Sequence, residues 1–183
     1  NWPTEAQAKP KIGKFGSIQL EKIVKLQPDL LLATSDMGHV LGPLKQVSVP
    51  VMAMDTSNVE SIMNNLLILG KIVDHVKESK QVVEDMRKEI RKAQVKIQRK
   101  FEDRPTVFYL VWDSPLITAS SQSFIGDVLY LSGGRNIVED TTAPFPHYSA
   151  ESLLKGDPEV LIVPKSVFQR VNLQKAPFNQ LKA

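Results

Sequence analysis

The chain has 183 residues, of which 42% are apolar and 23% are charged, and it contains no cysteine. This composition is too apolar for a disordered chain, and no run approaches the roughly 18 apolar residues that suggest a membrane-spanning helix. The lack of cysteine excludes disulfides, thiolate metal sites and a cysteine nucleophile. The formal net charge of +3 identifies no class of partner by itself.

Strand and helix patterns alternate along the chain. Short apolar runs bounded by turn residues predict buried parallel strands, and segments with helical spacing lie between them. The predicted helices cover 17–26, 38–46, 58–76, 77–102, 122–132, 149–155 and 176–183, and the predicted strands cover 29–34, 51–54, 106–112 and 159–163. This alternation is typical of an α/β fold with parallel sheets.

The longest predicted helix lies in the middle of the chain. Apolar residues recur from Val83 to Phe101 in steps of three and four, and neither Gly nor Pro interrupts them. We expect one helix over 77–102, about 39 Å long at 1.5 Å per residue, which ends before Pro105. Ser57 is expected to cap the helix that precedes it.

The same central segment carries the positive charge. Residues 77–104 hold ten Lys or Arg against six Asp or Glu, a net charge of +4. Charges of both signs intermix along one periodic segment, which is typical of a solvated helix face, whereas a nucleic-acid groove would interleave basic and aromatic residues. We therefore expect no nucleic-acid partner.

An internal repeat is the most informative feature of the sequence. QLEKIVKLQPDLLLA (19–33) aligns without a gap with SAESLLKGDPEVLIV (149–163). In each copy a glutamate, Glu21 or Glu151, stands seven residues before a proline, and an acidic residue and an apolar run follow that proline. Each copy therefore predicts a short helix, a proline turn and a buried strand.

The repeat predicts two related lobes. We expect an incomplete N-terminal lobe over 1–76, a connecting long helix over 77–104 and an incomplete C-terminal lobe over 105–183. A predicted strand and helix precede the second copy but not the first, and a strand follows the first copy but not the second. We therefore expect the chain to be an interior portion of a protein of about 250–300 residues.

Three phrases carry a resemblance to a known family, namely LEKIVKLQPDLLLA, FIGDVLYLSGGRNIVED and PFPHYSAESLLKGDPEVLIV. Over almost its whole length the chain resembles substrate-binding proteins of ABC importers that handle metal chelates: ferric siderophores, haem and cobalamin. The resemblance implies the class III periplasmic-binding-protein fold, in which two α/β lobes are joined by a long backbone helix. It also implies a ligand in the cleft between the lobes.

The resemblance further implies function and location. Members of the group are not enzymes. They capture an iron chelate or cobalamin and deliver it to an ABC permease with its ATPase. They are periplasmic or lipid-anchored outside the membrane, with an anchor cysteine that would precede Asn1. They use no cofactor of their own, because iron or cobalt arrives with the transported ligand. Which chelate is bound does not follow from the resemblance.

Two glutamates are candidate docking residues. Glu21 and Glu151 fall early in their predicted helices, where the helix dipole stabilises a carboxylate. Simple charging of the helix ends is one interpretation. The resemblance implies a sharper one, since in the family one such glutamate per lobe docks into an arginine-lined pocket of the permease.

Aromatic residues in loops are candidate ligand contacts. Ligands of open α/β sheets bind beyond the carboxyl ends of strands, and aromatic faces suit a flat macrocycle or chelate. The candidates are Trp2, Phe15, Trp112 and Phe145, with ordinary packing as the alternative for each. Cobalamin-binding members of the family carry aromatic residues matching Trp2, Phe15 and Phe145. Thr34 and Ser35 stand where some of them have tryptophan, which weakens the case for cobalamin.

His147 and Tyr148 are candidate axial ligands of a bound iron chelate. They precede the second glutamate helix, and haem-binding members of the family often use His or Tyr. A surface histidine without a metal role is the alternative. Three scattered histidines without a carboxylate cluster argue against a bare zinc site, so we expect no metal bound directly by the chain.

The competing function is an intracellular α/β enzyme or cofactor-binding domain on a similar two-lobed scaffold. No G-x-S-x-G elbow occurs, and nothing orders Asp113, Ser114 and His147 as a triad. The glycines match no phosphate loop or dinucleotide fingerprint. A binding protein therefore remains the leading interpretation.

Overall fold

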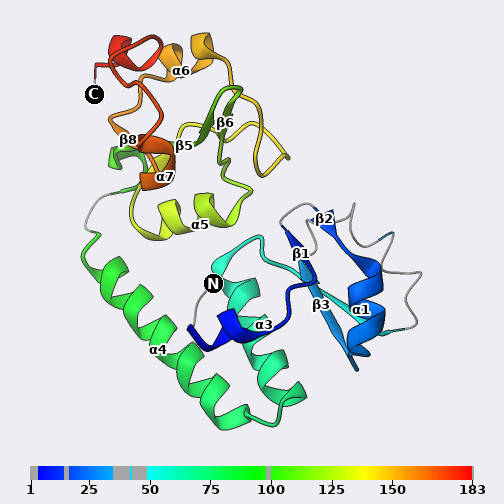
Figure 1. The fold of residues 1–183 in the computed structure, drawn as a ribbon. Coiled ribbons are helices and arrows are strands. Elements are labelled where there is room, and N and C mark those ends of the chain that lie inside the picture. The colour runs from blue at the N-terminus through cyan, green and yellow to red at the C-terminus, as the bar shows by residue number, and fades with distance from the viewer. Residues whose placement is uncertain (1–3, 15–16, 35–41, 43–48, 98–99, 183) are drawn as a thin grey trace. The chain divides into compact units, whose positions relative to one another are not determined.

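The computed structural model describes residues 4–14, 17–34, 42, 49–97 and 100–182 (Figure 1). The chain divides into two compact units, Asn1–Thr56 and Ser57–Ala183, which we call the N-terminal unit and the C-terminal unit. Among the described residues, no helix combines the length and the apolar character needed to cross a membrane.

The N-terminal unit contains one described α-helix and two small sheets. Its elements are η1 (Thr4–Ala8), β1 (Gly13–Lys14), β2 (Ser17–Ile18), α1 (Leu20–Leu26), β3 (Leu31–Thr34) and β4 (Val51–Met54). β1 and β2 are antiparallel, whereas β3 and β4 are parallel and in register from Leu31 opposite Val51. Ile23 of α1 is the buried centre of this unit, and Ile12, Ile18, Leu20, Leu31 and Val49 pack against it.

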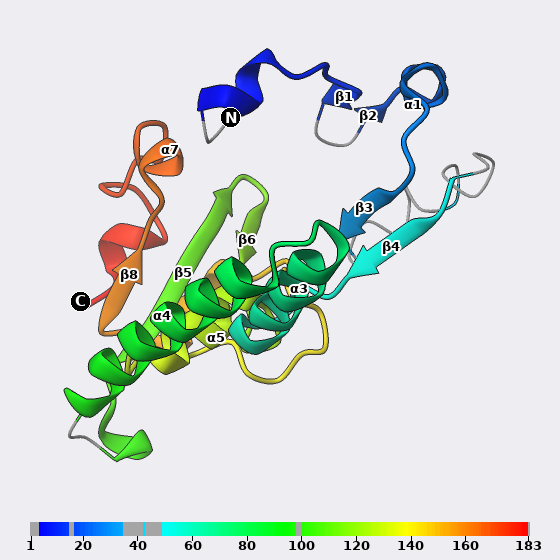
Figure 2. The ribbon, with the colours of Figure 1, turned by 90° about the horizontal axis from the view of Figure 1, so that it is seen from below.

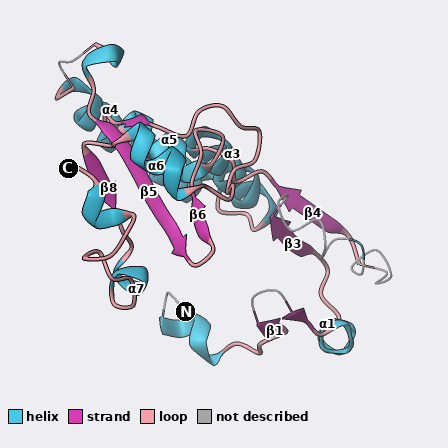
Figure 3. Cartoon of the chain, turned by 90° about the horizontal axis from the view of Figure 1, so that it is seen from above, coloured by secondary structure: helices cyan, strands magenta, loops and turns pink. Residues whose placement is uncertain are grey.

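The C-terminal unit holds the larger sheet and the long helices. Its elements are α3 (Val59–Ile72), α4 (Val76–Val95), η2 (Phe101–Asp103), β5 (Thr106–Asp113), β6 (Leu116–Thr118), α5 (Phe124–Leu131), β7 (Arg135–Asn136), α6 (Ala150–Gly156), β8 (Val160–Ile162), α7 (Lys165–Phe168) and η3 (Phe178–Gln180). β5 pairs in parallel with β7 and β8 and antiparallel with β6. Figures 2 and 3 show β8 and β6 on opposite sides of β5.

Two apolar clusters stabilise the C-terminal unit. The first surrounds the sheet and consists of the buried residues Phe108, Leu110, Val138, Leu153 and Val167. The second joins α3 to α4 through Val59, Met63 and Val83. A polar contact adds to the second, because the carboxylate Oδ2 of Asp127 on α5 accepts a hydrogen bond from the backbone N–H of Val59 at 2.8 Å. Asp127 thereby satisfies one of the free N–H groups at the start of α3.

The α/β class and several predicted elements are confirmed. β4 covers the predicted 51–54, β5 extends the predicted 106–112 by one residue, and α5 and α6 lie within one or two residues of their predicted bounds. The predicted helix 38–46 falls outside the described residues except for Gly42. The antiparallel strand β6 was not expected, so the larger sheet is mixed rather than purely parallel.

The long central helix is shorter than predicted. α4 ends at Val95 instead of near residue 102, so it is about 30 Å long at 1.5 Å per residue. Phe101 continues the helical spacing in the sequence, but its ring lies in the turn η2 and contacts the ring of Tyr130, with centroids 6.1 Å apart. Tertiary packing therefore overrides the periodicity at this end.

Four further predictions differ from the structure. The helix predicted over 17–26 begins only at Leu20, because Ser17 and Ile18 form the strand β2. α3 ends at Ile72 instead of near residue 76, and Asp74 in the following turn has a left-handed φ of 57°. Its cap is Asn58, not Ser57, since the Asn58 side chain accepts a hydrogen bond from Ser61 N–H at 2.8 Å. The predicted helix over 176–183 is only the short turn η3.

The boundary between the two compact units lies at a different place in the sequence from the predicted boundary of the lobes. The structure groups α3 with α4 and α5 in one unit that begins at Ser57, whereas the sequence places residues 58–76 in the N-terminal lobe. The limits of the lobes in the whole protein, 1–76, 77–104 and 105–183, stay predictions.

Candidate functional site

The carboxyl end of the central strand β5 presents Trp112. Of its surface, 43% is exposed, and its indole Nε1–H donates a hydrogen bond to the carbonyl oxygen of Ser114 at 2.9 Å. The indole has no other polar group. Trp112 therefore has no polar group left for a ligand, and any further contact is made through its ring.

Arg170 lies over that ring. Its guanidinium carbon is 3.3 Å from the ring centroid of Trp112, and its Nε is 3.5 Å from Oδ1 of Asp113. The turn that carries Arg170 is anchored by the buried Val167, whose carbonyl accepts the backbone N–H of Arg170 at 3.0 Å. Arg170 is not among the residues that the sequence predicts. The available signal was its position shortly after the predicted strand 159–163, where ligands of such sheets bind.

A second exposed aromatic residue, Phe145, lies on a segment that runs beside β6. The backbone of this segment is fixed by hydrogen bonds from Ser120 N–H to the carbonyl of Pro144, from Thr118 N–H to that of Pro146 and from Tyr148 N–H to that of Leu116. His147 of this segment forms an antiparallel bridge with Ile117 of β6. The Phe145 side chain is nevertheless 45% exposed. A fixed backbone with an exposed ring is suited to contact an apolar ligand face.

His147 and Tyr148 have different surroundings. His147 is exposed, whereas the ring of Tyr148 packs on Phe108 with the centroids 5.4 Å apart. Burial raises the pKa of the Tyr148 hydroxyl above its ordinary value, because a charged phenolate is less well solvated there. Both residues border a pocket of about 300 Å³ that Glu139 and Asp140 also line. Their role as axial ligands stays a prediction, and of the two His147 is the more exposed.

Three predicted ligand residues, Trp2, Phe15 and Ser35, lie outside the described residues, and their role also stays a prediction. Within the described part of the chain, no group of three or more His, Asp or Glu is placed to hold a metal ion. Asp113, which the sequence left open as part of a triad, forms its ion pair with Arg170.

The two predicted docking residues occupy equivalent places. Glu21 and Glu151 are both exposed and stand in the first turn of α1 and of α6. Each of these helices has seven residues, and each is followed by a residue with left-handed backbone, Gln27 or Asp157. The repeat in the sequence is therefore a repeat in structure.

Comparison with known proteins gives a family and curated relatives. A family model described as periplasmic binding protein matches residues 1–180. The vitamin B12-binding protein of Vibrio parahaemolyticus serotype O3:K6 is 31% identical over 163 residues, which are 88% of this chain and 58% of the relative. That of Pectobacterium atrosepticum is 28% identical over 169 residues, 89% of this chain and 60% of the relative. The chain thus spans about three fifths of these relatives.

Two solved structures have the same fold over nearly the whole length of this chain. The structure of S. aureus IsdE complexed with heme has a TM-score of 0.84 at 21% identity and covers 99% of this chain and 74% of that one. The periplasmic vitamin B12 binding protein BtuF of Vibrio cholerae has a TM-score of 0.80 at 23% identity, with 98% and 71% covered. At these identities the likeness establishes the fold.

Proposed function

Because the chain belongs to the periplasmic binding protein family, we propose that the protein containing it captures a metal chelate and delivers it to the permease and ATPase of an ABC importer. The ligand classes are an iron chelate, haem or siderophore, and cobalamin. The protein acts outside the cytoplasm, in the periplasm or on the outer face of the cell membrane. Any contact with the membrane is through a lipid anchor outside the present sequence.

The observation that carries the proposal is the pair of exposed glutamates in two copies of one structural unit. Glu21 and Glu151 stand at the same helical position 130 residues apart. A carboxylate in the first turn of a helix is stabilised by the dipole and stays free to pair with an arginine of a partner. Two such charges on separate units fix the orientation of docking as well as its affinity.

Exposed aromatic surface supports the ligand class. Trp112 and Phe145 leave more than two fifths of their surfaces exposed in the C-terminal unit, where a flat apolar chelate gains most from burial. Curated relatives are named as binding vitamin B12, and structures of the same fold are named as binding vitamin B12 or haem. We propose that these two residues, with Trp2, Phe15, Ser35, His147 and Tyr148, contact the ligand.

The test of capture is an absorbance titration. The longest natural form of the protein that contains these residues is titrated with haemin, cyanocobalamin and ferric siderophores. We expect saturable binding of at least one of them, with a shifted absorption band for haemin if His147 or Tyr148 ligates the iron. Failure of all three to bind overturns the proposal and favours the alternative, an intracellular α/β enzyme or cofactor-binding domain.

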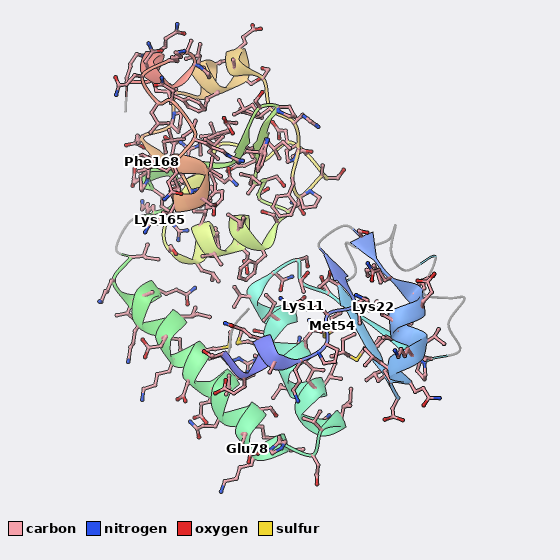
Figure 4. The ribbon with its side chains drawn as sticks, in the orientation of Figure 1. Lys11, Lys22, Met54, Glu78, Lys165 and Phe168 are labelled. Carbon is pink, nitrogen blue, oxygen red and sulfur yellow. The ribbon has the colours of Figure 1, made fainter. Side chains whose placement is uncertain are left out.

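The test of delivery uses the glutamates. Glu21→Ala and Glu151→Ala should leave ligand affinity within about twofold and reduce ATP-driven uptake by about tenfold each, because a docking charge pair is lost. Glu78→Ala is the matched control, since Glu78 is an exposed glutamate in the first turn of α4 outside both copies (Figure 4). Unchanged uptake by the double variant would refute docking through these residues.

A further inference from the structure

Arg170 and Trp112 form a stacked pair that the function proposed above does not yet use. A guanidinium carbon 3.3 Å from a ring centroid is in contact with the indole ring, an arrangement in which the cation and the ring quadrupole attract each other. The pair therefore presents a positive charge on an aromatic platform, at the carboxyl ends of β5 and β8. This is the edge of the sheet where ligands of α/β folds bind.

The contacts of Arg170 leave one side of its guanidinium available. A guanidinium carries five N–H donors, one on Nε and four on the two Nη atoms. Asp113 faces Nε, at 3.5 Å, and the Nη atoms make no hydrogen bond within the described part of the chain. The two Nη atoms form the edge that matches the two oxygens of a carboxylate or phosphate.

The neighbouring groups hold this edge in place. Asp113 pairs with the guanidinium on its Nε side, and the ring of Trp112 contacts its central carbon. Trp112 is itself held by the hydrogen bond from its Nε1–H to the Ser114 carbonyl. The side chain of Arg170 is 38% exposed, so an anion reaches it without the burial of an unpaired charge. Because the site is assembled before binding, little side-chain entropy is lost when an anion arrives.

We propose that Arg170, stacked on Trp112 and oriented by Asp113, binds a peripheral oxyanion of the captured chelate. The proposal rests on the function given above and narrows its ligand class to chelates that carry a carboxylate or a phosphodiester. Haem offers propionates and cobalamin offers the phosphodiester of its nucleotide loop. Arg170 is then a specificity-determining residue, and other residues contact the macrocycle and the metal centre.

The test compares ligands that differ in this anion. Haemin is paired with haemin dimethyl ester, and cyanocobalamin with dicyanocobinamide, which lacks the whole nucleotide loop including its phosphodiester. The comparison of wild type with Arg170→Gln on each ligand isolates the part that the anion contributes. Dissociation constants are measured by absorbance or by Trp fluorescence for the wild-type protein and Arg170→Gln. For the pair that the wild type binds, we expect Arg170→Gln to lower the affinity for the anionic ligand by about 5- to 30-fold. The affinity for the ligand that lacks the anion should fall by less than about twofold.

Two further variants separate charge from geometry. Arg170→Lys keeps the charge but loses the planar two-pronged edge, so it should recover only part of the affinity for the anionic member. Arg91→Gln removes one positive charge from an exposed site on α4 in the same unit and should change no affinity. An equal loss of affinity for both members of a pair, or no loss for either, overturns the proposal.

The outcomes also distinguish failure of the proposed function from failure of the role given to Arg170. If the wild type binds none of the four ligands and no ferric siderophore, the proposed function fails and the role of Arg170 fails with it. If the wild type binds a ferric siderophore alone, the proposed function stands and the role given to Arg170 fails. If the wild type binds but Arg170→Gln shows no selective loss for the anionic member, only the role of Arg170 fails. A selective loss with haemin assigns the anion as a carboxylate, and a selective loss with cyanocobalamin assigns it as a phosphodiester.

Discussion

The first copy of the helix–turn–strand repeat, α1 to β3, and the second copy, α6 to β8, have the same backbone conformation but different surroundings. In both, a seven-residue helix ends in a left-handed residue directly before a proline, Pro28 or Pro158. Since a residue before proline avoids the right-handed helical region, the sequence itself ends both helices at the same place.

The surroundings of the two copies differ. Leu153 in the second copy is completely buried within a cluster of five buried residues. Its counterpart Ile23 is also buried, but only partly buried residues pack against it. The second copy also has a cap from Ser149 and a pairing of Asp157 with Lys182, whereas Gln19 makes no side-chain cap. The difference shows that local sequence determines the shape of the unit and that its neighbours determine how firmly it is held.

The largest expected effect comes from the buried residue of each copy. Leu153→Ala should cost about 4 kcal/mol and Ile23→Ala about 2 kcal/mol, because the loss grows with the cavity that a tightly packed site leaves. Hydrogen-exchange mass spectrometry of residues 150–162 and 20–34 reads the two copies separately in one sample. Equal losses of protection would show that the packing around the copies is equivalent, against the comparison.

An intermediate effect is expected at the helix caps. The Ser149 hydroxyl accepts the backbone N–H of Ser152 at 2.9 Å, so Ser149→Ala should cost about 1 kcal/mol. Gln19→Ala removes no cap and should stay within about 0.5 kcal/mol. Urea unfolding followed by circular dichroism measures both. If Gln19→Ala lowers the free energy of unfolding as much as Ser149→Ala does, the two copies do not differ in their helix caps.

The smallest effect is a pH dependence confined to the second copy. The backbone N–H of Lys182 and then its ammonium group lower the pKa of the Asp157 carboxyl below its ordinary value. The folded state therefore binds this proton less readily than the unfolded state. The resulting stability is complete above a pH of about 4 and is lost as the pH falls through the lowered pKa.

Asp157→Asn sharpens this prediction, because asparagine tolerates the left-handed backbone but does not titrate. The variant should show a flatter dependence of the urea midpoint on pH between about 5 and 2. Gln27, the equivalent residue of the first copy, has no titrating group, so Gln27→Asn is the matched control. An unchanged slope in Asp157→Asn would mean that other carboxyl groups produce the acid sensitivity.

How far the fold follows from the sequence can be judged on particular elements. β4 and β5 are predicted within one residue because apolar runs between turn residues define buried strands locally. The end of α4 is not predicted, because the contact of Phe101 with Tyr130 joins residues 29 positions apart. The two-residue strand β7 and the three-residue strand β6 are too short for any period to identify.

The candidate site was predictable to a smaller extent. Trp112 and Phe145 are exposed, as a ligand contact requires, and Glu21 and Glu151 occupy equivalent helix starts. Arg170 could not be assigned to Trp112 from the sequence, because 58 residues separate them and only the parallel pairing of β5 with β8 brings their strand ends together. The roles of all these residues await the experiments above.

The hydrogen bond from Val59 to Asp127 has a practical consequence for dissecting the molecule. It links the start of α3 to a carboxylate 68 positions later, so a polypeptide cut between Thr56 and Ser57 keeps donor and acceptor together. A cut after residue 76, where the sequence places the lobe limit, would separate them and strip Val59 and Met63 from Val83. A fragment designed to keep the sheet of the C-terminal unit in its native packing should therefore begin before α3 and include both α3 and α4.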